Sequence, residues 1–275
     1  MKNGDDIFPR PIQPSEFIWI RDFLQARTGI TLNDGKQALV MGRLEKRLRK
    51  RGIQSYSDYF ALLGHPAHED ETQLAIDLLT TNETYFFREP RHFDYLQKSI
   101  LPHLPASRSV RIWSAASSSG EEAYSIAMVM AEHCRSGIWE VLGSDISSTV
   151  LERAQRALYP IAAAEKIPPA MLKKYCLKGK EEFDDFFLID STLRSHVHFQ
   201  ALNLIEALPD IGQFDVIFLR NVMIYFDVDT KKRLIARVTE KMKPGAYLLV
   251  SHSETLNGLQ QTMRLVSPSI YRLEG

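Results

Sequence analysis

Two stretches of the chain carry residue types that could bind a nucleotide-like ligand. The first is the loop at residues 115–120 (AASSSG), which follows a strand-like run beginning at Val110. Its small side chains would let a ligand lie against backbone amides, and the N-terminus of the next helix adds a favourable dipole. The second is Asp145, which ends the next strand-like run, where a carboxylate can accept hydrogen bonds from ribose hydroxyls. Close packing of helix against strand explains the loop equally well, and Asp145 could instead cap the following helix.

Two acidic residues indicate which ligand fits this loop. Glu121 and Glu122 lie in the first turn of the helix that follows it. A carboxylate there stabilises the helix dipole in any protein, but it would also repel a pyrophosphate. The loop lacks the GxGxxG pattern of dinucleotide sites as well. The residues therefore favour a ligand without phosphates, and S-adenosylmethionine, a sulfonium cation with an ammonium group, is the obvious candidate.

The elements that must position these residues begin at about residue 100. Apolar strand-like runs alternate with helical patterns, which predicts a parallel, doubly wound α/β sheet that binds ligands at the carboxyl ends of its strands. The alternation lapses at 159–200, where 183–189 and 196–200 suggest a small antiparallel β insert. The predicted strands start at Val110, Trp139, Phe214 and Ala246, and the predicted helices are 121–132, 149–157 and 230–242, with Lys243-Pro-Gly as a stop signal.

The first third of the chain has a different pattern of apolar residues. Residues 1–14 hold three prolines and few apolar side chains, so we expect a flexible tail there. From 15 to 80 apolar residues such as Phe17, Ile20 and Leu24 recur at helix spacing, which predicts a small all-α domain. Residues 81–99 would then link it to an α/β domain at 100–275.

Composition excludes several classes of protein. The 275 residues include 34 basic and 34 acidic side chains, so net charge favours neither a nucleic-acid binder nor an acidic-ligand binder. Cys134 and Cys176 are the two cysteines, in no metal-ligand spacing, so we expect no disulfide framework and no zinc site. The N-terminus lacks the apolar core of a signal peptide, and no run is long enough to span a bilayer. These features predict a cytoplasmic protein.

Three blocks of sequence resemble the hallmark blocks of CheR-type chemotaxis receptor methyltransferases. They are residues 79–89 (LTTNETYFFRE), 113–125 (WSAASSSGEEAYS) and 214–226 (FDVIFLRNVMIYF), in the same order as in that family. The similarity runs from about residue 15 to the C-terminus. One departure is Ala123, where the family often has proline in a first helical turn that tolerates either residue.

The resemblance implies a fold, an activity and a set of site residues. The fold is an all-α domain followed by a Rossmann-like methyltransferase domain with a small antiparallel β insert. The activity is transfer of a methyl group from S-adenosylmethionine to receptor glutamates, forming methyl esters and S-adenosylhomocysteine. The segment 81–99 would contribute to the active site. Expected cofactor contacts are Asn82, Thr84, Arg88, Glu122, Asp145, Asn203, Leu204, Arg220 and Asn221, with Arg88 and Tyr225 beside the transferred methyl group.

The expected chemistry suits these residues. A glutamate carboxylate is already ionised at neutral pH, so it can attack a sulfonium methyl group without a general base. The enzyme must supply alignment and exclude water. The planar fork of Arg88 could hold the carboxylate while Tyr225 offers a second donor. Arg88 could instead be a structural ion-pair partner of Glu83 or Glu89.

Residues 36–51 form a basic helix in the predicted all-α domain. Five cations fall within a sector of about 100° of its circumference, away from the apolar stripe of Val40, Leu44 and Leu48. The row lacks i,i+4 acidic partners, so it is either a solvated face or a surface for an acidic partner such as the methylation helices of the receptors. RNA is an alternative, but no aromatic residues interleave the cations. The five expected receptor-binding residues are Lys36, Arg43, Lys46, Arg47 and Lys50.

Two other functions and one partner stay open at this point. The fold also fits a methyltransferase of RNA or a small molecule, or a non-catalytic signalling module. We expect a monomer that contacts the cytoplasmic helical bundle of receptors, with no nucleic acid, no metal and no membrane insertion. In some family members the β insert docks a receptor C-terminal peptide with the help of a glycine-containing turn. Here the turn reads KGKEEFDDF at 178–186, more acidic and with one glycine, which leaves such tethering open.

Overall fold

The computed structural model describes residues 10–274, which form two compact units. One unit comprises the described residues up to Thr81 together with Tyr225–Asp227, and the other comprises Asn82–Ile224 and the chain from Val228. Residues 1–9 of the predicted tail lie outside the described part. Among the described residues, none of the helices combines the length and apolar character that crossing a bilayer requires.

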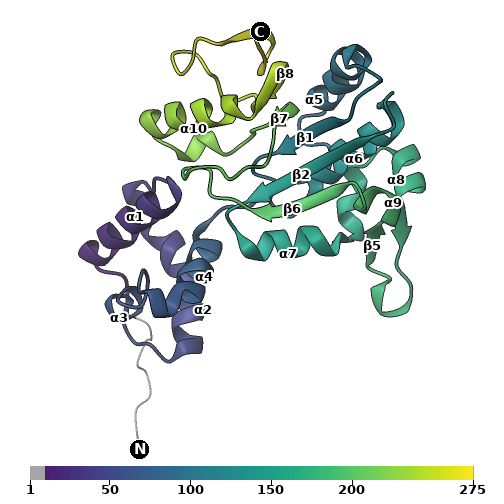
Figure 1. The fold of residues 1–275 in the computed structure, drawn as a ribbon. Helices are drawn as coiled ribbons and strands as arrows, with labels where there is room; N and C mark the ends of the chain where they lie inside the picture. The colour runs from purple at the N-terminus through teal and green to yellow at the C-terminus, as the bar shows by residue number, and fades with distance from the viewer. Residues whose placement is uncertain (1–9, 275) are drawn as a thin grey trace, which may run out of the picture. The chain divides into compact units, whose positions relative to one another are not determined.

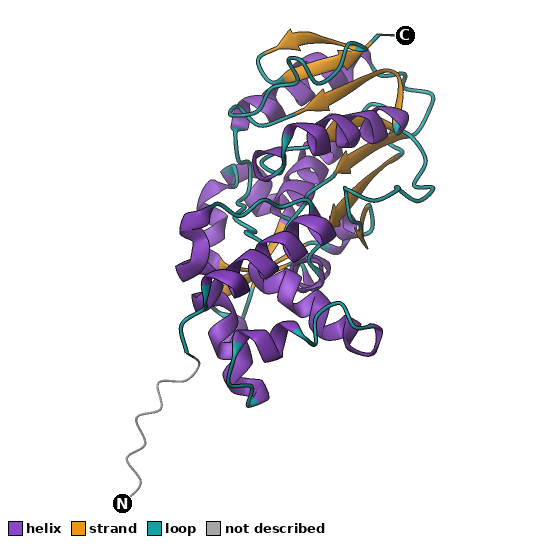
Figure 2. Cartoon of the chain, turned by 90° about the vertical axis from the view of Figure 1, so that its left-hand side faces the viewer, coloured by secondary structure: helices purple, strands orange, loops and turns teal. Residues whose placement is uncertain are grey.

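The N-terminal unit is built from helices, as Figure 2 shows for the segment after the N-terminus. This confirms the predicted all-α domain. Its core unites apolar stripes of successive helices, including Phe17, Ile20 and Leu24 with Val40, Leu44 and Leu48. Ile12 is also buried in this core, so the end of the predicted tail is packed. The helices are α1 (Pro14–Thr28), α2 (Gln37–Arg51), α3 (Tyr56–Phe60) and α4 (Glu69–Leu79).

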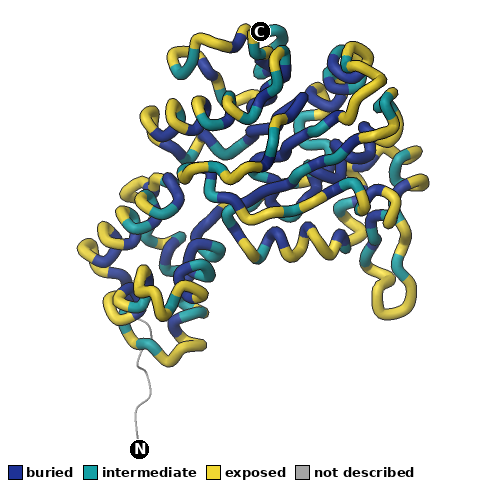
Figure 3. The backbone as a smooth tube through the Cα atoms, viewed as in Figure 1, coloured by how far each residue is buried: buried dark blue, intermediate teal, exposed yellow. Residues whose placement is uncertain are grey.

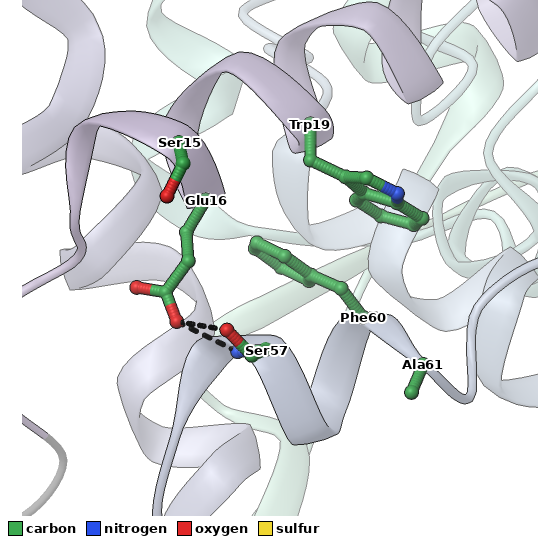
Figure 4. Close-up of a pocket in the computed structure, with 6 residues that line it drawn as sticks. All are labelled: Ser15, Glu16, Trp19, Ser57, Phe60 and Ala61. Carbon is green, nitrogen blue, oxygen red and sulfur yellow. Dashed lines mark hydrogen bonds between the residues drawn. The ribbon is translucent and has the colours of Figure 1, made fainter.

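Glu16 ties the start of α1 to α3. Its carboxylate accepts hydrogen bonds from the Gln13 amide at 2.8 Å and from the Ser57 amide at 2.9 Å. Figure 4 shows this contact on one wall of a cavity of about 320 Å³, with Trp19 stacked on Phe60 at 5.0 Å between ring centroids. The Glu16 carboxylate on this wall thus caps α1 and joins it to α3.

The second unit is an α/β fold around a seven-stranded sheet, as predicted. The sheet order is β6-β2-β1-β7-β8-β10-β9, parallel from β6 to β8 and antiparallel at β10 and β9. Figure 3 shows the central strands mostly buried. The strands are β1 (Val110–Ser114), β2 (Trp139–Asp145), β6 (Val197–Ala201), β7 (Phe214–Phe218), β8 (Met242–Leu249), β9 (Met263–Ser267) and β10 (Ile270–Leu273).

Helices cover both sides of this sheet. α6 (Glu121–His133) packs on β1, β2 and β6, and α7 (Ser148–Arg156) packs on β2 and β6. α10 (Val228–Glu240) connects β7 to β8, and Figure 1 shows α7 and α10 on opposite sides of the sheet. Connections between parallel strands are almost always right-handed. Because the strand order runs outward from β1 in both directions, right-handed connections place the helices of the two halves on opposite faces of the sheet.

A three-stranded antiparallel sheet forms the predicted insert. It consists of β3 (Leu158–Pro160), β5 (Phe186–Ile189) and β4 (Cys176–Lys178), with α8 (Pro169–Tyr175) and a short α9 (Ser191–Arg194) nearby in the chain. The prediction that 196–200 belongs to this insert is wrong, because β6 pairs in parallel with β2 in the main sheet. The helix predicted at 230–242 ends before Lys243-Pro-Gly, as expected, because α10 stops at Glu240. The strand predicted to start at Ala246 begins earlier, at Met242, so Lys243-Pro-Gly lies within β8.

The segment predicted as a linker is part of the α/β unit. It contains α5 (Pro90–Tyr95) and a π-helical turn at Leu96–Ile100. Phe86, Phe93 and Leu96 are buried in the core of this unit. The segment is therefore held rigidly enough to position polar side chains.

Candidate active site

The sheet order places a ligand site between two loops. Chain order reverses between β1 and β7, and open α/β sheets bind ligands at the carboxyl edge of such a switch point. The loop after β1 is residues 115–120, and the loop after β7 begins at Leu219. β2 and β6 end at the same edge, because they run parallel to β1.

The loop after β1 has a sharply turned backbone. Ser118 has a φ of 48° and Gly120 a φ of 95°, both in the left-handed region. A Cβ on Gly120 would also lie 2.9 Å from both Ala154 Cβ and the Tyr159 hydroxyl oxygen. Close packing against Ala154 and Tyr159 therefore explains Gly120, while Ser119 beside it is half-buried.

Asp145 joins the loops that follow β1 and β2. Its Oδ2 accepts a hydrogen bond from the Ser118 amide at 2.9 Å, and its Oδ1 accepts one from the Ser147 amide at 3.0 Å. Ser147 is the residue before α7, so Asp145 does order the start of that helix, as the alternative interpretation held. A carboxylate can accept about four hydrogen bonds, so this role leaves the ribose interpretation open.

Arg220 and two glutamates form a buried network under the switch point. The Arg220 side chain is 1% exposed and its Nη1 lies 2.8 Å from Glu122 Oε2. Its Nη2 donates to the main-chain carbonyl of Arg88 at 2.5 Å and lies 3.2 Å from Glu89 Oε2. Burial raises the pKa of Glu122 above its ordinary value, and the Arg220 guanidinium opposes that shift. The side chain of Arg220 thus binds protein groups and fixes the position of the Arg88 main chain.

Arg88 lies in a strained turn and has a different environment. Phe87 and Glu89 on either side of it have φ values of 54° and 57°. Strain of this kind is common at functional sites. Arg88 Nη1 donates to the main-chain carbonyl of Glu83 at 2.7 Å, and residues 10–274 provide no ion pair for its guanidinium. The predicted alternative of an ion pair with Glu83 or Glu89 is therefore wrong.

Glu254 organises the loop after β7, and the sequence did not reveal it. Its carboxylate accepts hydrogen bonds from the amides of Asn221 at 3.0 Å, Ile224 at 3.2 Å and Ser251 at 2.9 Å. Asn221 itself has a φ of 58°. No local pattern indicates this role, because the donors come from two separate loops.

The remaining expected cofactor contacts lie in loops of the same unit. The Asn82 carbonyl accepts a hydrogen bond from the Ser118 hydroxyl at 2.9 Å, and Thr84 is half-buried nearby in the chain. Asn203 and Leu204 follow β6, where Asn203 donates to Glu206 at 2.8 Å and Leu204 is buried. The structure thus connects Asn82 with Asp145 through Ser118.

Tyr225 groups with the N-terminal unit. Its carbonyl accepts a hydrogen bond from the Thr31 amide at 2.9 Å, and its side chain is half-buried. Arg88 belongs to the other unit, so the pairing of Arg88 with Tyr225 stays a prediction.

The basic helix α2 has acidic and carbonyl partners that its own sequence does not contain. Arg47 Nε donates to Glu71 of α4 at 2.7 Å, and Arg51 lies 3.2 Å from the same carboxylate. Arg43 donates to the carbonyls of Leu79 at 2.6 Å and Thr80 at 2.9 Å, at the end of α4. The row has no i,i+4 acidic partner, as the sequence indicated, but the expectation that Arg43 and Arg47 are available to a receptor is wrong, because they join α2 to α4.

Three lysines of the predicted row are different. Lys36, Lys46 and Lys50 are exposed, and the described part of the chain offers none of them an ion pair. The cationic surface that a partner could contact is therefore these lysines.

Comparisons with known proteins show the family of the chain. Residues 15–80 match the protein family described as "CheR methyltransferase, all-alpha domain". Residues 82–271 match the family described as "CheR methyltransferase, SAM binding domain". A chemotaxis protein methyltransferase of Klebsiella aerogenes is 38% identical, covering 96% of this chain and 91% of its own. That of Escherichia coli is 36% identical, covering 95% and 92%.

One solved structure among those that align is PKMT2 of Rickettsia typhi in complex with AdoHcy. It shares 12% identity, covers 62% of this chain and 26% of its own, and has a TM-score of 0.37. The family domains, in contrast, span nearly all of the described residues. The chain belongs to the CheR methyltransferase family, and its α/β unit binds S-adenosylmethionine.

Proposed function

We propose that this methyltransferase transfers the methyl group of S-adenosylmethionine to glutamate side chains of chemotaxis receptors. The products would be glutamate methyl esters and S-adenosylhomocysteine. The relatives named chemotaxis protein methyltransferase support the receptor as substrate. The observation that carries the glutamate assignment is the Arg88 guanidinium, which a carbonyl anchors and no carboxylate neutralises among residues 10–274.

The residues at the carboxyl edge of the sheet suit a cationic, hydroxyl-bearing ligand. Asp145 and Glu122 supply carboxylates, and the loop at 115–120 supplies small side chains and no cation. Bound S-adenosylmethionine supplies an electrophilic methyl group on a sulfonium. We assign Asp145 to the ribose hydroxyls, with Asn82, Thr84, Asn203, Leu204 and Asn221 as further contacts. Arg220 and Glu122 would act mainly by fixing the walls of the site.

Arg88 would orient the substrate carboxylate. Its remaining N–H groups can donate two parallel hydrogen bonds to a carboxylate, which sets the direction of one oxygen. The Arg88 guanidinium donates to the Glu83 carbonyl, and Arg220 donates to the main-chain carbonyl of Arg88. Both contacts restrict Arg88, so less conformational freedom is lost when the substrate carboxylate binds. Tyr225 would add a second donor to the same carboxylate. No general base is needed, because glutamate is already ionised at neutral pH.

The exposed lysines and the insert would contact the receptor. Lys36, Lys46 and Lys50 would face glutamates of its cytoplasmic helical bundle, with the enzyme acting in the cytoplasm as a monomer. A receptor C-terminal peptide would meet the edge of the insert sheet beside Gly179. That glycine serves the turn itself, because a Cβ there would clash with the Phe183 carbonyl oxygen.

The test uses labelled S-adenosylmethionine and a receptor cytoplasmic fragment, with and without its C-terminal peptide. We expect label on the fragment that mild base releases, and its loss when the receptor glutamates are replaced. Arg88→Ala should lower kcat at least about tenfold, as expected for removal of a charged hydrogen-bond partner. Arg88→Lys should rescue poorly, because a lysine cannot reproduce the planar fork. Arg91→Ala is the matched control, since Arg91 is an exposed arginine of the same segment.

Two results would contradict the proposal. Base-stable label would place the methyl group on an atom other than a carboxylate oxygen. Near-normal turnover of the Arg88→Lys variant would reduce Arg88 to a generic cation.

A further inference from the structure

Two histidines and a glutamate converge at the end of the strained turn that holds Arg88. His92 Nδ1 lies 3.3 Å from Glu89 Oε2, and His252 Nε2 lies 3.9 Å from the same oxygen. The side chain of His92 is 1% exposed and that of His252 is 43% exposed. All three residues belong to the α/β unit, although His252 is remote in sequence.

Ser269 lies between the rings of the two histidines. Its hydroxyl lies 2.8 Å from His92 Nε2, 3.1 Å from His252 Nδ1 and 2.6 Å from the Pro268 carbonyl. When the hydroxyl donates to that carbonyl, its oxygen can accept an N–H from both rings. The other nitrogen of each ring is then free of hydrogen and lies on the side of Glu89.

Glu89 Oε2 has the Arg220 guanidinium at 3.2 Å and accepts a hydrogen bond from the His252 amide at 3.3 Å. The buried His92 Nδ1, in contrast, has no hydrogen-bond partner. A buried polar atom without a partner is costly, which calls for a ligand.

We propose that Glu89, His92 and His252 bind a divalent transition-metal cation of the zinc type. The three ligand atoms lie within 4.8 Å of one another. Tetrahedral zinc with bonds of about 2.0–2.1 Å places its ligands about 3.4 Å apart, which the Glu89–His92 pair already satisfies. His252 is exposed enough to close the remaining gap. Two histidines and one carboxylate leave a fourth position for water.

Ser269 would support the metal as an outer partner. Ligating histidines commonly donate their second N–H to a neighbouring acceptor, which fixes the tautomer. Here one hydroxyl serves both rings. Arg220 adds positive charge near Glu89 Oε2. Glu122 pairs with the same guanidinium, so the Arg220–Glu122 pair carries no net charge that would repel a bound cation.

The experiment titrates Co²⁺ and Zn²⁺ into the full-length, untagged chain after chelator treatment. Co²⁺ binding is read from visible absorption, and Zn²⁺ binding from competition with a chromophoric chelator. We expect one equivalent to bind and the thermal unfolding midpoint to rise, because the site exists only in the folded state. His252→Ala should weaken binding at least tenfold. Ser269→Ala should weaken it about 10–100-fold.

His198→Ala is the control, since His198 is an exposed histidine of the same unit outside the cluster, and it should bind as the wild type does. His252→Ala should keep its fold because its ring is partly exposed, which thermal unfolding without metal checks. The absence of one-equivalent binding in the wild type would overturn the site. Equal affinity of His252→Ala and the wild type would overturn it as well.

Discussion

Arg88 and Arg220 lie in the same α/β unit, yet their surroundings give the two guanidinium groups different roles. Arg220 has two carboxylates and the Arg88 carbonyl as partners and is 1% exposed. Arg88 has a single carbonyl anchor. Residue type alone cannot separate them, because the difference lies in which acceptors the fold brings near each one. In the proposed function, Arg220 would act on substrate only through the position of the Arg88 main chain.

Asp145 gives the sharpest residue-level prediction. Asp145→Ala should weaken binding of S-adenosylhomocysteine by about 1.5–3 kcal/mol, the usual value for hydrogen bonds to a charged group. Calorimetry measures the change. Asp190→Ala is a matched control, because Asp190 likewise accepts a hydrogen bond from the amide two residues on, at 2.8 Å, but caps α9. It should leave the affinity intact. An unchanged affinity of a folded Asp145→Ala variant would refute the ribose assignment.

At the scale of elements, local patterns predicted the central strands and failed where pairing is remote. β1, β2 and β7 are buried apolar runs, and each lies where the sequence placed it. β6 is a mostly exposed strand that follows the insert directly in the chain, so its pattern could not indicate which sheet it joins. Only its parallel register with β2 decides that.

The residues of the candidate site likewise divide into those that a local pattern predicts and those that depend on remote contacts. Asp145 and the loop at 115–120 follow from strand–loop–helix order, which a sequence displays directly. Glu254 could not be predicted, because it binds amides of Asn221 and Ile224 from a different loop. Asp145 also binds main-chain amides, but its place at the end of a predicted strand marks it, whereas Glu254 lies in a loop with no such pattern.

The basic helix was misinterpreted in part for a related reason. The i,i+4 rule compares a cation with neighbours on its own helix. Arg47 finds its acid on α4, where Glu71 is 4% exposed. Absence of a local partner therefore does not identify an exposed cation.

Glu71 gives the prediction for this pair of helices. Glu71→Gln should destabilise the packing of α2 on α4 by about 2–4 kcal/mol at pH 7, because it leaves a partly buried Arg47 without its acid. The hydrogen bonds from Arg47 lower the pKa of Glu71. Its stabilisation is thus complete above the ordinary value of 4.5 and is lost as pH falls through the lower folded value. Hydrogen exchange of α2 and α4 should show a difference between variant and wild type that shrinks with acid.

Glu45→Gln is the control for that measurement. Glu45 pairs with Arg49 on the same helix, and both side chains are substantially exposed, at 42% and 58%. Its replacement should change exchange by no more than about 0.5 kcal/mol. Equal effects of the two replacements would mean that the Glu71 pair does not join the helices.

At the scale of the whole molecule, the net charge of zero gives no indication of the exposed lysines on one face of α2. The chain is neutral, with 34 charges of each sign, so no overall field would steer it to an acidic receptor. Intramolecular pairing removes Arg43 and Arg47 from the available cations. Electrostatic docking through the predicted row on α2 would then depend on its exposed lysines.

Replacing Lys46 and Lys50 by alanine should raise the receptor KM and leave S-adenosylmethionine affinity unchanged, because these exposed lysines act on encounter rather than on methyl transfer. Raising salt from low to physiological strength should weaken the wild type more than the variant, since exposed charges are screened over about 8–10 Å. The double variant Lys173→Ala/Lys232→Ala removes the same charge from exposed sites on α8 and α10 and should behave as wild type. Steady-state methylation at two salt concentrations, with and without competing RNA, measures each effect. If RNA rather than receptor loses affinity, the surface binds phosphates. If both double variants match the wild type at low salt, α2 is an ordinary solvated face whose arginines serve only the fold.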